Sequence, residues 1–160
     1  SLQEKRIETR QEFDLKIDEV AVAIIGRLAP VKNHQLFFEI VKLVHLHTSV
    51  KPVFFIVGDG ERKEFVDDQV NELTKLGVDI RSTSWIKDIA SFNAGMDIIC
   101  LTSKNEGTPV SIIEAQASEV AVISTNVGGV SNVLINNESG YIVPSDNARI
   151  FAEKLIFLID

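Results

Sequence analysis

Two glutamates, Glu106 and Glu114, stand eight positions apart in a stretch that could bind an anion and a polyhydroxylated ligand. The apolar run 96–101 before them predicts a buried strand, and Pro109 suits the start of a helix after a short polar loop. Backbone N–H groups at a helix N-terminus attract phosphate, and carboxylates accept hydrogen bonds from sugar hydroxyls. The N–H groups that this geometry leaves free belong to Gly107, Thr108 and Val110. The alternative is that Glu106 only complements the helix dipole and Glu114 is a rim charge.

Two cations follow an earlier apolar run in a similar position. Gly26 ends the run 20–26, Arg27 comes directly after it, and Lys32 precedes a segment of helical period. Cations beside helix N–H groups form an anion site, although the spacing is neither G-x-G-x-x-G nor a P-loop. From spacing alone, Arg27 and Lys32 could equally be ordinary surface charges.

Two glycine-containing loops follow other apolar runs. Gly58 and Gly60 flank Asp59, and Gly128 and Gly129 lie between Val127 and Val130. Glycine allows a backbone to approach a phosphate or a sugar closely. The alternative is that both loops are simple turns, because these residue types are common in turns.

The elements that must position these residues alternate along the chain. Short apolar runs predict strands at 20–26, 52–58, 79–82, 96–101, 120–124 and 141–143. Helical periodicity or boundary signals predict helices at 36–47, 61–76, 87–94, 110–118, 130–135 and 147–160. Strands that are apolar on both faces, with helices between them, indicate a doubly wound α/β domain: a Rossmann-like parallel sheet of about six strands with helices on both faces. Ligands bind beyond the carboxyl ends of such strands, where all the loops described above lie.

The composition sets limits on function. With 160 residues and a formal charge of −7, the chain is expected to form one domain at 19–160 without a general nucleic-acid surface. Residues 1–18 are charged and are expected to form a lead-in helix or linker. No apolar run approaches the length of a membrane span, and the polar N-terminus is unlike a secretory signal. The single cysteine, Cys100, lies in an apolar run, which fits a buried side chain in a reducing compartment.

Metal and nucleophile chemistry have little support in the sequence. The three histidines, His34, His45 and His47, show no ligand spacing with other candidates, and we interpret them as structural or surface residues. There is no Asp-x-Asp pair and no Gly-x-Ser-x-Gly motif. No metal site is predicted.

The motifs resemble a known family when they are taken together. Arg27 with Lys32, the segment 57–60, Glu106 with Glu114, and the segment 126–130 resemble the retaining glycosyltransferases of family 4, which have the GT-B fold. The similarity is to their C-terminal, donor-binding domain and covers roughly residues 20–159. It implies transfer of a hexose-type sugar from a UDP- or GDP-sugar to a glycan or lipid-linked acceptor in cell-surface polysaccharide synthesis.

The resemblance also implies how such an enzyme is organised. The acceptor would be bound by an N-terminal domain that this chain lacks, so the chain alone is expected to be inactive. No cofactor or metal is expected. The parent enzyme is expected in the cytoplasm, peripheral at the inner face of the membrane. Two alternatives are a stand-alone nucleotide-sugar binding module and a GT-B-type sugar-nucleotide epimerase.

Roles for individual residues follow from the same resemblance. Arg27 and Lys32 would neutralise the donor diphosphate, Glu106 would contact hydroxyls of the donor sugar, and Glu114 would bind the ribose. The other implied donor contacts are Gly26, Gly58, Gly60, Trp85, Ile86, Asn105, Gly107, Thr108, Pro109, Val110, Gly128 and Gly129. The sequence Gly107-Thr108-Pro109 departs from the Gly-Phe-Gly or Gly-Leu-Gly frequent in the family and leaves the donor sugar open.

Overall fold

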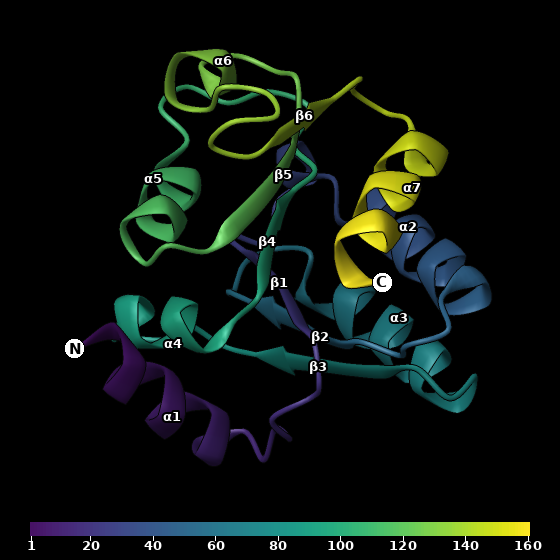
Figure 1. The fold of residues 1–160 in the computed structure, drawn as a ribbon. Helices are drawn as coiled ribbons and strands as arrows, with labels where there is room; N and C mark the ends of the chain where they lie inside the picture. Colours follow the sequence, from purple (N-terminus) through teal and green to yellow (C-terminus); the bar gives the residue numbers. More distant parts are fainter.

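Six parallel strands form one sheet in the computed structural model, which describes residues 1–160 throughout (Figure 1). The strands are β1 (Ala21–Ile25), β2 (Val53–Val57), β3 (Asp79–Thr83), β4 (Ile98–Leu101), β5 (Ala121–Thr125) and β6 (Tyr141–Val143). Their order across the sheet is β3-β2-β1-β4-β5-β6, with every neighbouring pair parallel. The predicted doubly wound sheet is confirmed.

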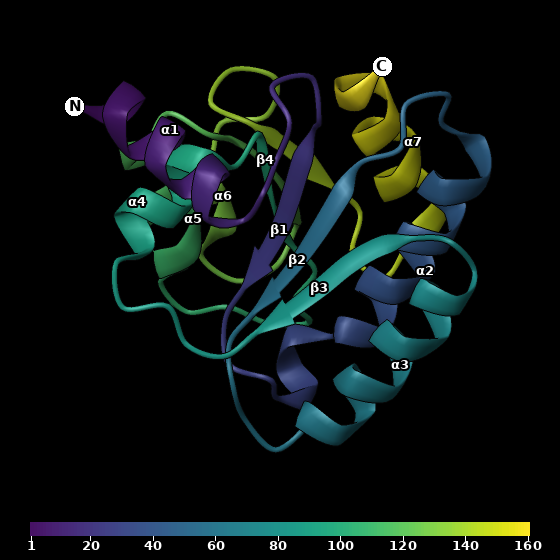
Figure 2. The same cartoon turned by 90° about the horizontal axis from the view of Figure 1, so that it is seen from below.

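Helices cover both faces of this sheet. They are α1 (Leu2–Glu12), α2 (His34–His47), α3 (Lys63–Lys75), α4 (Ile89–Gly95), α5 (Val110–Ala117), α6 (Val130–Val133) and α7 (Ala148–Ile159). Figures 1 and 2 show α2, α3 and α7 on one face, and α1, α4, α5 and α6 on the other. Each helical layer packs its own apolar cluster against the sheet.

Burial on both faces explains the apolar runs of the central strands. Every residue of β1, β2 and β4 is buried, because helices cover these strands from both sides. The pairing register places Ile24 of β1 between Ile56 of β2 and Cys100 of β4. Burial raises the pKa of the Cys100 thiol, so this side chain acts as a small apolar group in the core.

The order of the strands creates a switch point between β1 and β4. The chain leaves β1 toward α2 on one face and leaves β4 toward α5 on the other. Adjacent loops that diverge in this way open a crevice at the carboxyl ends of the two strands. The segments 26–33 and 102–109, which contain residues predicted to bind a ligand, lie at this switch point.

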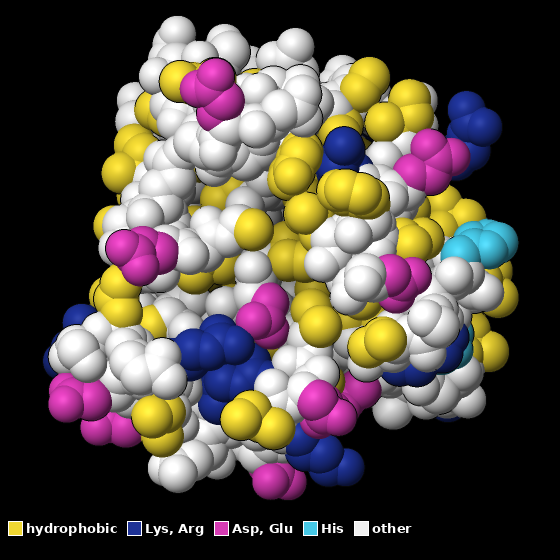
Figure 3. All heavy atoms as spheres, viewed as in Figure 1, with side chains coloured by type: hydrophobic (Ala, Val, Ile, Leu, Met, Phe, Trp, Pro, Cys, Tyr) yellow, Lys and Arg dark blue, Asp and Glu magenta, His cyan; other side chains and the backbone are white.

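The N-terminal segment packs firmly against the domain. Arg10 is buried and donates to the carbonyl oxygens of Gly95, Lys16 and Glu19 at 3.0, 2.7 and 2.6 Å. Its guanidinium also pairs with Asp97 just before β4. Figure 3 shows Lys and Arg side chains gathered beside the position of α1, next to an acidic side chain. The lead-in segment therefore includes a helix that is docked on α4 and the start of β4.

The helix α3 is shorter than its apolar pattern suggested. The pattern predicted a helix at 61–76, but α3 ends at Lys75 and the apolar side chain of Leu76 is 67% exposed. The chain turns at Gly77, whose φ of 91° is a left-handed conformation that favours glycine.

Candidate functional site

A close ion pair joins the loops that follow β1 and β4. Nζ of Lys32 lies 3.0 Å from Oε1 and 2.9 Å from Oε2 of Glu106, so both carboxylate oxygens contact the ammonium. The Lys32 side chain is 24% exposed and the Glu106 side chain is 9% exposed. The structure thus brings together two of the predicted site residues, which are 74 positions apart in the chain.

Backbone and hydroxyl contacts hold the loop that carries Lys32. Lys32 ends a short 3₁₀ helix, Pro30–Lys32, and Asn33 follows with the left-handed φ of 54°. The hydroxyl of Thr102 donates to the carbonyl oxygens of Lys32 and Asn33 at 2.9 and 3.2 Å. The N–H of Lys104 donates to the carbonyl oxygen of Val31 at 2.8 Å. These bonds join the loop after β1 to the loop after β4 and orient Lys32 toward Glu106.

Two glycines hold the loop that carries Glu106. The N–H of Gly129 donates to the carbonyl oxygen of Glu106 at 3.1 Å. A Cβ atom at Gly128 would lie 1.7 Å from the same oxygen, and one at Gly129 would lie 2.3 Å from the carbonyl oxygen of Gly107. The loops after β4 and β5 therefore pack backbone against backbone, at a distance that only glycine allows.

The helix after β4 begins as the sequence predicted, but one backbone N–H that was expected to be free has an acceptor. Pro109 occupies the N-cap position of α5 and is buried. The N–H groups of Gly107 and Thr108 have no acceptor in the protein, whereas that of Val110 donates to the carbonyl oxygen of Thr108 at 2.9 Å. Two of the three expected amides are free to meet a ligand. The expectation for Val110 is not met in this structure, because the turn at Pro109 uses its N–H.

Two of the charged residues predicted to bind the donor at this edge of the sheet have side chains without a partner. Glu114 is half-buried on α5 and makes no hydrogen bond or ion pair. Arg27 follows β1 directly, is exposed, and is likewise unpaired. Asn105 and Thr108 are also exposed beside Glu106. The edge therefore presents a free cation and a free carboxylate in addition to the Lys32–Glu106 pair.

The glycines after β1 and β2 form a second close backbone contact. A Cβ atom at Gly58, which has a φ of 145°, would lie 1.9 Å from the carbonyl oxygen of Gly26. A Cβ atom at Gly60 would lie 2.7 Å from the carbonyl oxygen of Leu28. Both glycines are therefore required for loop packing, whether or not they also approach a ligand.

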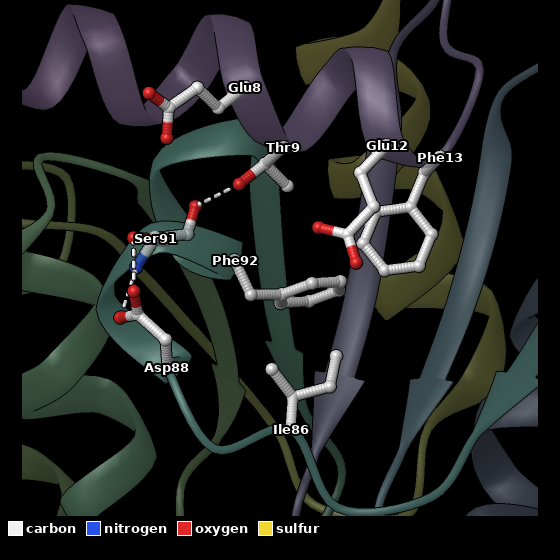
Figure 4. A pocket seen from close by; sticks show the side chains of 8 residues that line it. All are labelled: Glu8, Thr9, Glu12, Phe13, Ile86, Asp88, Ser91 and Phe92. Carbon is white, nitrogen blue, oxygen red and sulfur yellow. Dashed lines mark hydrogen bonds between the residues drawn. The ribbon is translucent and has the colours of Figure 1, made fainter.

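The loop after β3 separates its two predicted site residues. Trp85 is 57% exposed, whereas Ile86 is half-buried. Ile86 lines a hollow of about 300 Å³ between this loop, α1 and α4 (Figure 4). The charged groups that line the hollow are the carboxylates of Glu8, Glu12 and Asp88. Three carboxylates disfavour an anion, so a phosphate is better accommodated at the crevice of Lys32.

His34 is a buried polar residue that the sequence analysis did not place at the site. It begins α2 directly after the Lys32 loop, is 4% exposed, and neither ring nitrogen has a hydrogen-bond partner. Its pKa is lowered to about 4, mainly by burial, and the positive charges of Lys32 and Arg62 act in the same direction. The imidazole is therefore neutral at pH 7. The sequence did not predict this burial, because a histidine at the start of an apolar helix has the same pattern whether its side chain is buried or exposed.

Comparison with known proteins identifies the family. The family described as Glycosyl transferases group 1 matches residues 19–160. The UDP-Gal:alpha-D-GlcNAc-diphosphoundecaprenol alpha-1,3-galactosyltransferase of Escherichia coli is 32% identical over 151 residues, which are 91% of this chain and 38% of that protein. The capsular polysaccharide biosynthesis glycosyltransferase CapM of Staphylococcus aureus is 28% identical over 144 residues, or 89% of this chain and 37% of CapM.

A solved structure agrees with this assignment. The C-terminal domain of the glycosyl transferase group 1 family protein LpcC from Francisella tularensis superimposes with a TM-score of 0.81 and 26% identity, covering 96% of this chain and 82% of that one. The chain belongs to the group 1 glycosyltransferase family and has the fold of its GT-B C-terminal domains. It spans less than two-fifths of the length of the two curated relatives. None of its helices combines the length and the apolar character needed to cross a membrane.

Proposed function

We propose that this chain binds the donor of a retaining glycosyltransferase that moves a hexose-type sugar from a UDP- or GDP-sugar to a glycan or lipid-linked acceptor. The observation that carries this proposal is the meeting of Lys32 and Glu106 at the switch point, beside the free N–H groups of Gly107 and Thr108. A cation and free amides suit a diphosphate, and a carboxylate suits sugar hydroxyls.

The unpaired groups extend this site to the rest of a nucleotide sugar. We assign Glu114 to the ribose hydroxyls, because it is half-buried and has no partner to displace. We assign Arg27 to the diphosphate together with Lys32, because its exposed guanidinium is free to form a bidentate contact with phosphate. Trp85 offers an exposed ring for contact with the base.

The chemistry that we propose is electrostatic. The bond between C1 of the sugar and the diphosphate oxygen breaks, and its electron pair goes to the diphosphate. The acceptor oxygen forms its bond to C1 on the same face, and its proton passes to the departing phosphate. Negative charge grows on the diphosphate during this step, so fixed cations from Arg27 and Lys32 would stabilise the transition state more than the ground state.

The acceptor and the cellular setting come from relatives and belong to the proposal. The Escherichia coli relative is named for transfer to a diphosphoundecaprenol-linked sugar, and CapM for capsular polysaccharide biosynthesis. We propose that the parent enzyme acts on a related acceptor, held by a separate N-terminal domain, as a peripheral protein at the cytoplasmic face of the membrane.

Isothermal titration calorimetry tests the donor assignment. This chain is titrated with UDP-glucose, UDP-galactose, UDP-N-acetylglucosamine and GDP-mannose, with ATP as a control for non-specific binding of nucleotides. Saturable binding of one or more nucleotide sugars, without comparable binding of ATP, is expected. Failure of all four to bind would contradict the proposal.

A further inference from the structure

Glu106 already binds the ammonium group of Lys32, which an incoming anion would need as its partner. Both of its oxygens contact Nζ of Lys32, at 3.0 and 2.9 Å, and its side chain is 9% exposed. Breaking a pair with so little exposure is unfavourable unless both charges find new partners, because water reaches them poorly. A diphosphate that approaches Lys32 therefore meets a cation that is already neutralised.

The loop after β5 holds the backbone of Glu106 in place. Its carbonyl oxygen accepts from the N–H of Gly129 and lies directly against Gly128, where there is no room even for a methyl group. The carbonyl oxygen of Gly107 likewise lies directly against Gly129. The carboxylate can therefore release Lys32 by a change of side-chain partner, but a retreat of the loop would disrupt this packing.

We propose that Glu106 makes the crevice select the sugar-bearing donor over the free nucleoside diphosphate, an inference that rests on the proposed function. Hydroxyls of the donor sugar donate to Glu106 and replace Lys32, whose ammonium then turns to the diphosphate. A diphosphate without a sugar brings the negative charge but no hydroxyl donors, so it competes with Glu106 for Lys32. Once the sugar has been transferred, the Lys32–Glu106 pair re-forms and the hold on the diphosphate product weakens.

The variant Glu106→Gln tests this selection, because it keeps the shape and a hydrogen-bonding oxygen but removes the charge. Calorimetry compares UDP with UDP-glucose, and GDP with GDP-mannose, on the wild-type chain and on the variant. The wild type is expected to prefer the sugar-bearing form. In the variant, the affinity for the free diphosphate should rise by about two- to fivefold, the order that a partly exposed ion pair contributes. The affinity for the sugar-bearing form should rise less, so the preference for that form over the free diphosphate falls.

Two comparisons separate this effect from a general change of charge. Glu61→Gln removes an exposed, unpaired carboxylate after β2 that has no role in the proposed site, and it should not tighten binding of the free diphosphate. In a Lys32→Met background, Glu106→Gln should give a smaller gain, because it then relieves only the repulsion between Glu106 and the diphosphate and releases no cation. The coupling between the two substitutions measures the role of the pair directly.

Each outcome decides between the two proposals. If the wild type binds none of the four nucleotide sugars named for the donor test, the proposed function and this inference both fail. If the wild type binds a nucleotide sugar but binds the free diphosphate at least as tightly, only this inference fails. If the wild type binds but Glu106→Gln does not tighten the free diphosphate, or tightens it equally in the Lys32→Met background, only this inference fails. Should Glu106→Gln not fold, as judged by circular dichroism, Glu106→Asp replaces it. That variant retracts the carboxylate by one methylene and must also tighten the free diphosphate.

Discussion

At the scale of single residues, the site contains carboxylates in two different states. Glu106 is almost fully buried and bound to Lys32, whereas Glu114 is half-buried and unpaired. A paired carboxylate must exchange one partner for another when a ligand binds, but an unpaired one gains a partner without losing any. The two glutamates should therefore respond differently to substitution, even though one motif contains both.

Removing Glu114 should weaken donor binding without opening a cavity in the core. We predict that Glu114→Ala lowers the affinity for the nucleotide sugar by about 1–3 kcal/mol, the value expected for losing a hydrogen bond to a charged group. Calorimetry with the donor that binds the wild type measures this loss. Glu153→Ala, on the exposed surface of α7, is the control and should leave the affinity unchanged. Unchanged affinity in Glu114→Ala would contradict the ribose assignment.

Arg27 should matter for the rate of transfer more than for stability. Its side chain is exposed and makes no contact that Arg27→Ala would remove from the folded protein. We predict that kcat falls by about 100- to 1000-fold, because removing one group that stabilises developing charge typically has this effect. The measurement needs an enzyme that carries this domain together with an acceptor domain. Lys42→Ala, on the exposed face of α2, is the control, and wild-type turnover in Arg27→Ala would remove this residue from the proposed mechanism.

At the scale of elements, contacts between loops position the charged groups. Thr102 and Lys104 join the loop after β4 to the loop after β1, and the hydroxyl of Thr125 in β5 donates to the carbonyl oxygen of Ser103 at 2.8 Å. Gly128 and Gly129 then fix the backbone around Glu106. Hydrogen bonds therefore join the carboxyl end of β1 to that of β4, and the carboxyl end of β4 to that of β5.

The two glycines of neighbouring loops provide a matched test of this packing. We predict that Gly128→Ala lowers the free energy of unfolding by about 1–3 kcal/mol, because a Cβ there would meet the carbonyl oxygen of Glu106 and φ is +51°. Gly107→Ala should change it by less than about 0.5 kcal/mol, because nothing lies within 4 Å of its Cβ position. Urea unfolding of the two variants measures the difference. Equal stability would show that the loops are not tightly packed.

The sequence predicted the elements better than the contacts between them. Continuous apolar runs identified β1, β2 and β4, because burial on both faces leaves no polar positions in these strands. The pairing of Lys32 with Glu106 was not predictable, because it depends on how two loops meet across 74 positions. The same limit applies to the partner of the Val110 N–H, which depends on the turn geometry at Pro109. Hydrophobic periodicity carries no information on either contact.

At the scale of the whole molecule, polar groups at opposite edges of the sheet are satisfied to different degrees. At the edge where the strands begin, Arg6 and Arg10 of α1 bond to carbonyl oxygens and to Asp97. At the edge where they end, His34 and Ser103 are buried without partners for their side-chain polar atoms, as is Asn93 on α4, and Arg27 and Glu114 are unpaired. The first edge contributes stability, whereas the second keeps polar groups available at a cost to stability.

His34 should make the stability of the whole domain depend on pH. Its pKa is about 4 in the folded chain and 6.5 in the unfolded one, so between these values the unfolded state binds more protons. Stability from this residue is fully present above pH 6.5 and is lost as the pH falls toward 4, a total of roughly 3 kcal/mol at 1.36 kcal/mol per pH unit. Urea unfolding at pH 7.5, 6, 5 and 4.5 should show a steeper loss for the wild type than for His34→Phe. Because carboxylates titrate in both proteins, the difference between the two curves isolates the histidine, and parallel curves would mean that His34 is protonated as easily in the folded state as in the unfolded one.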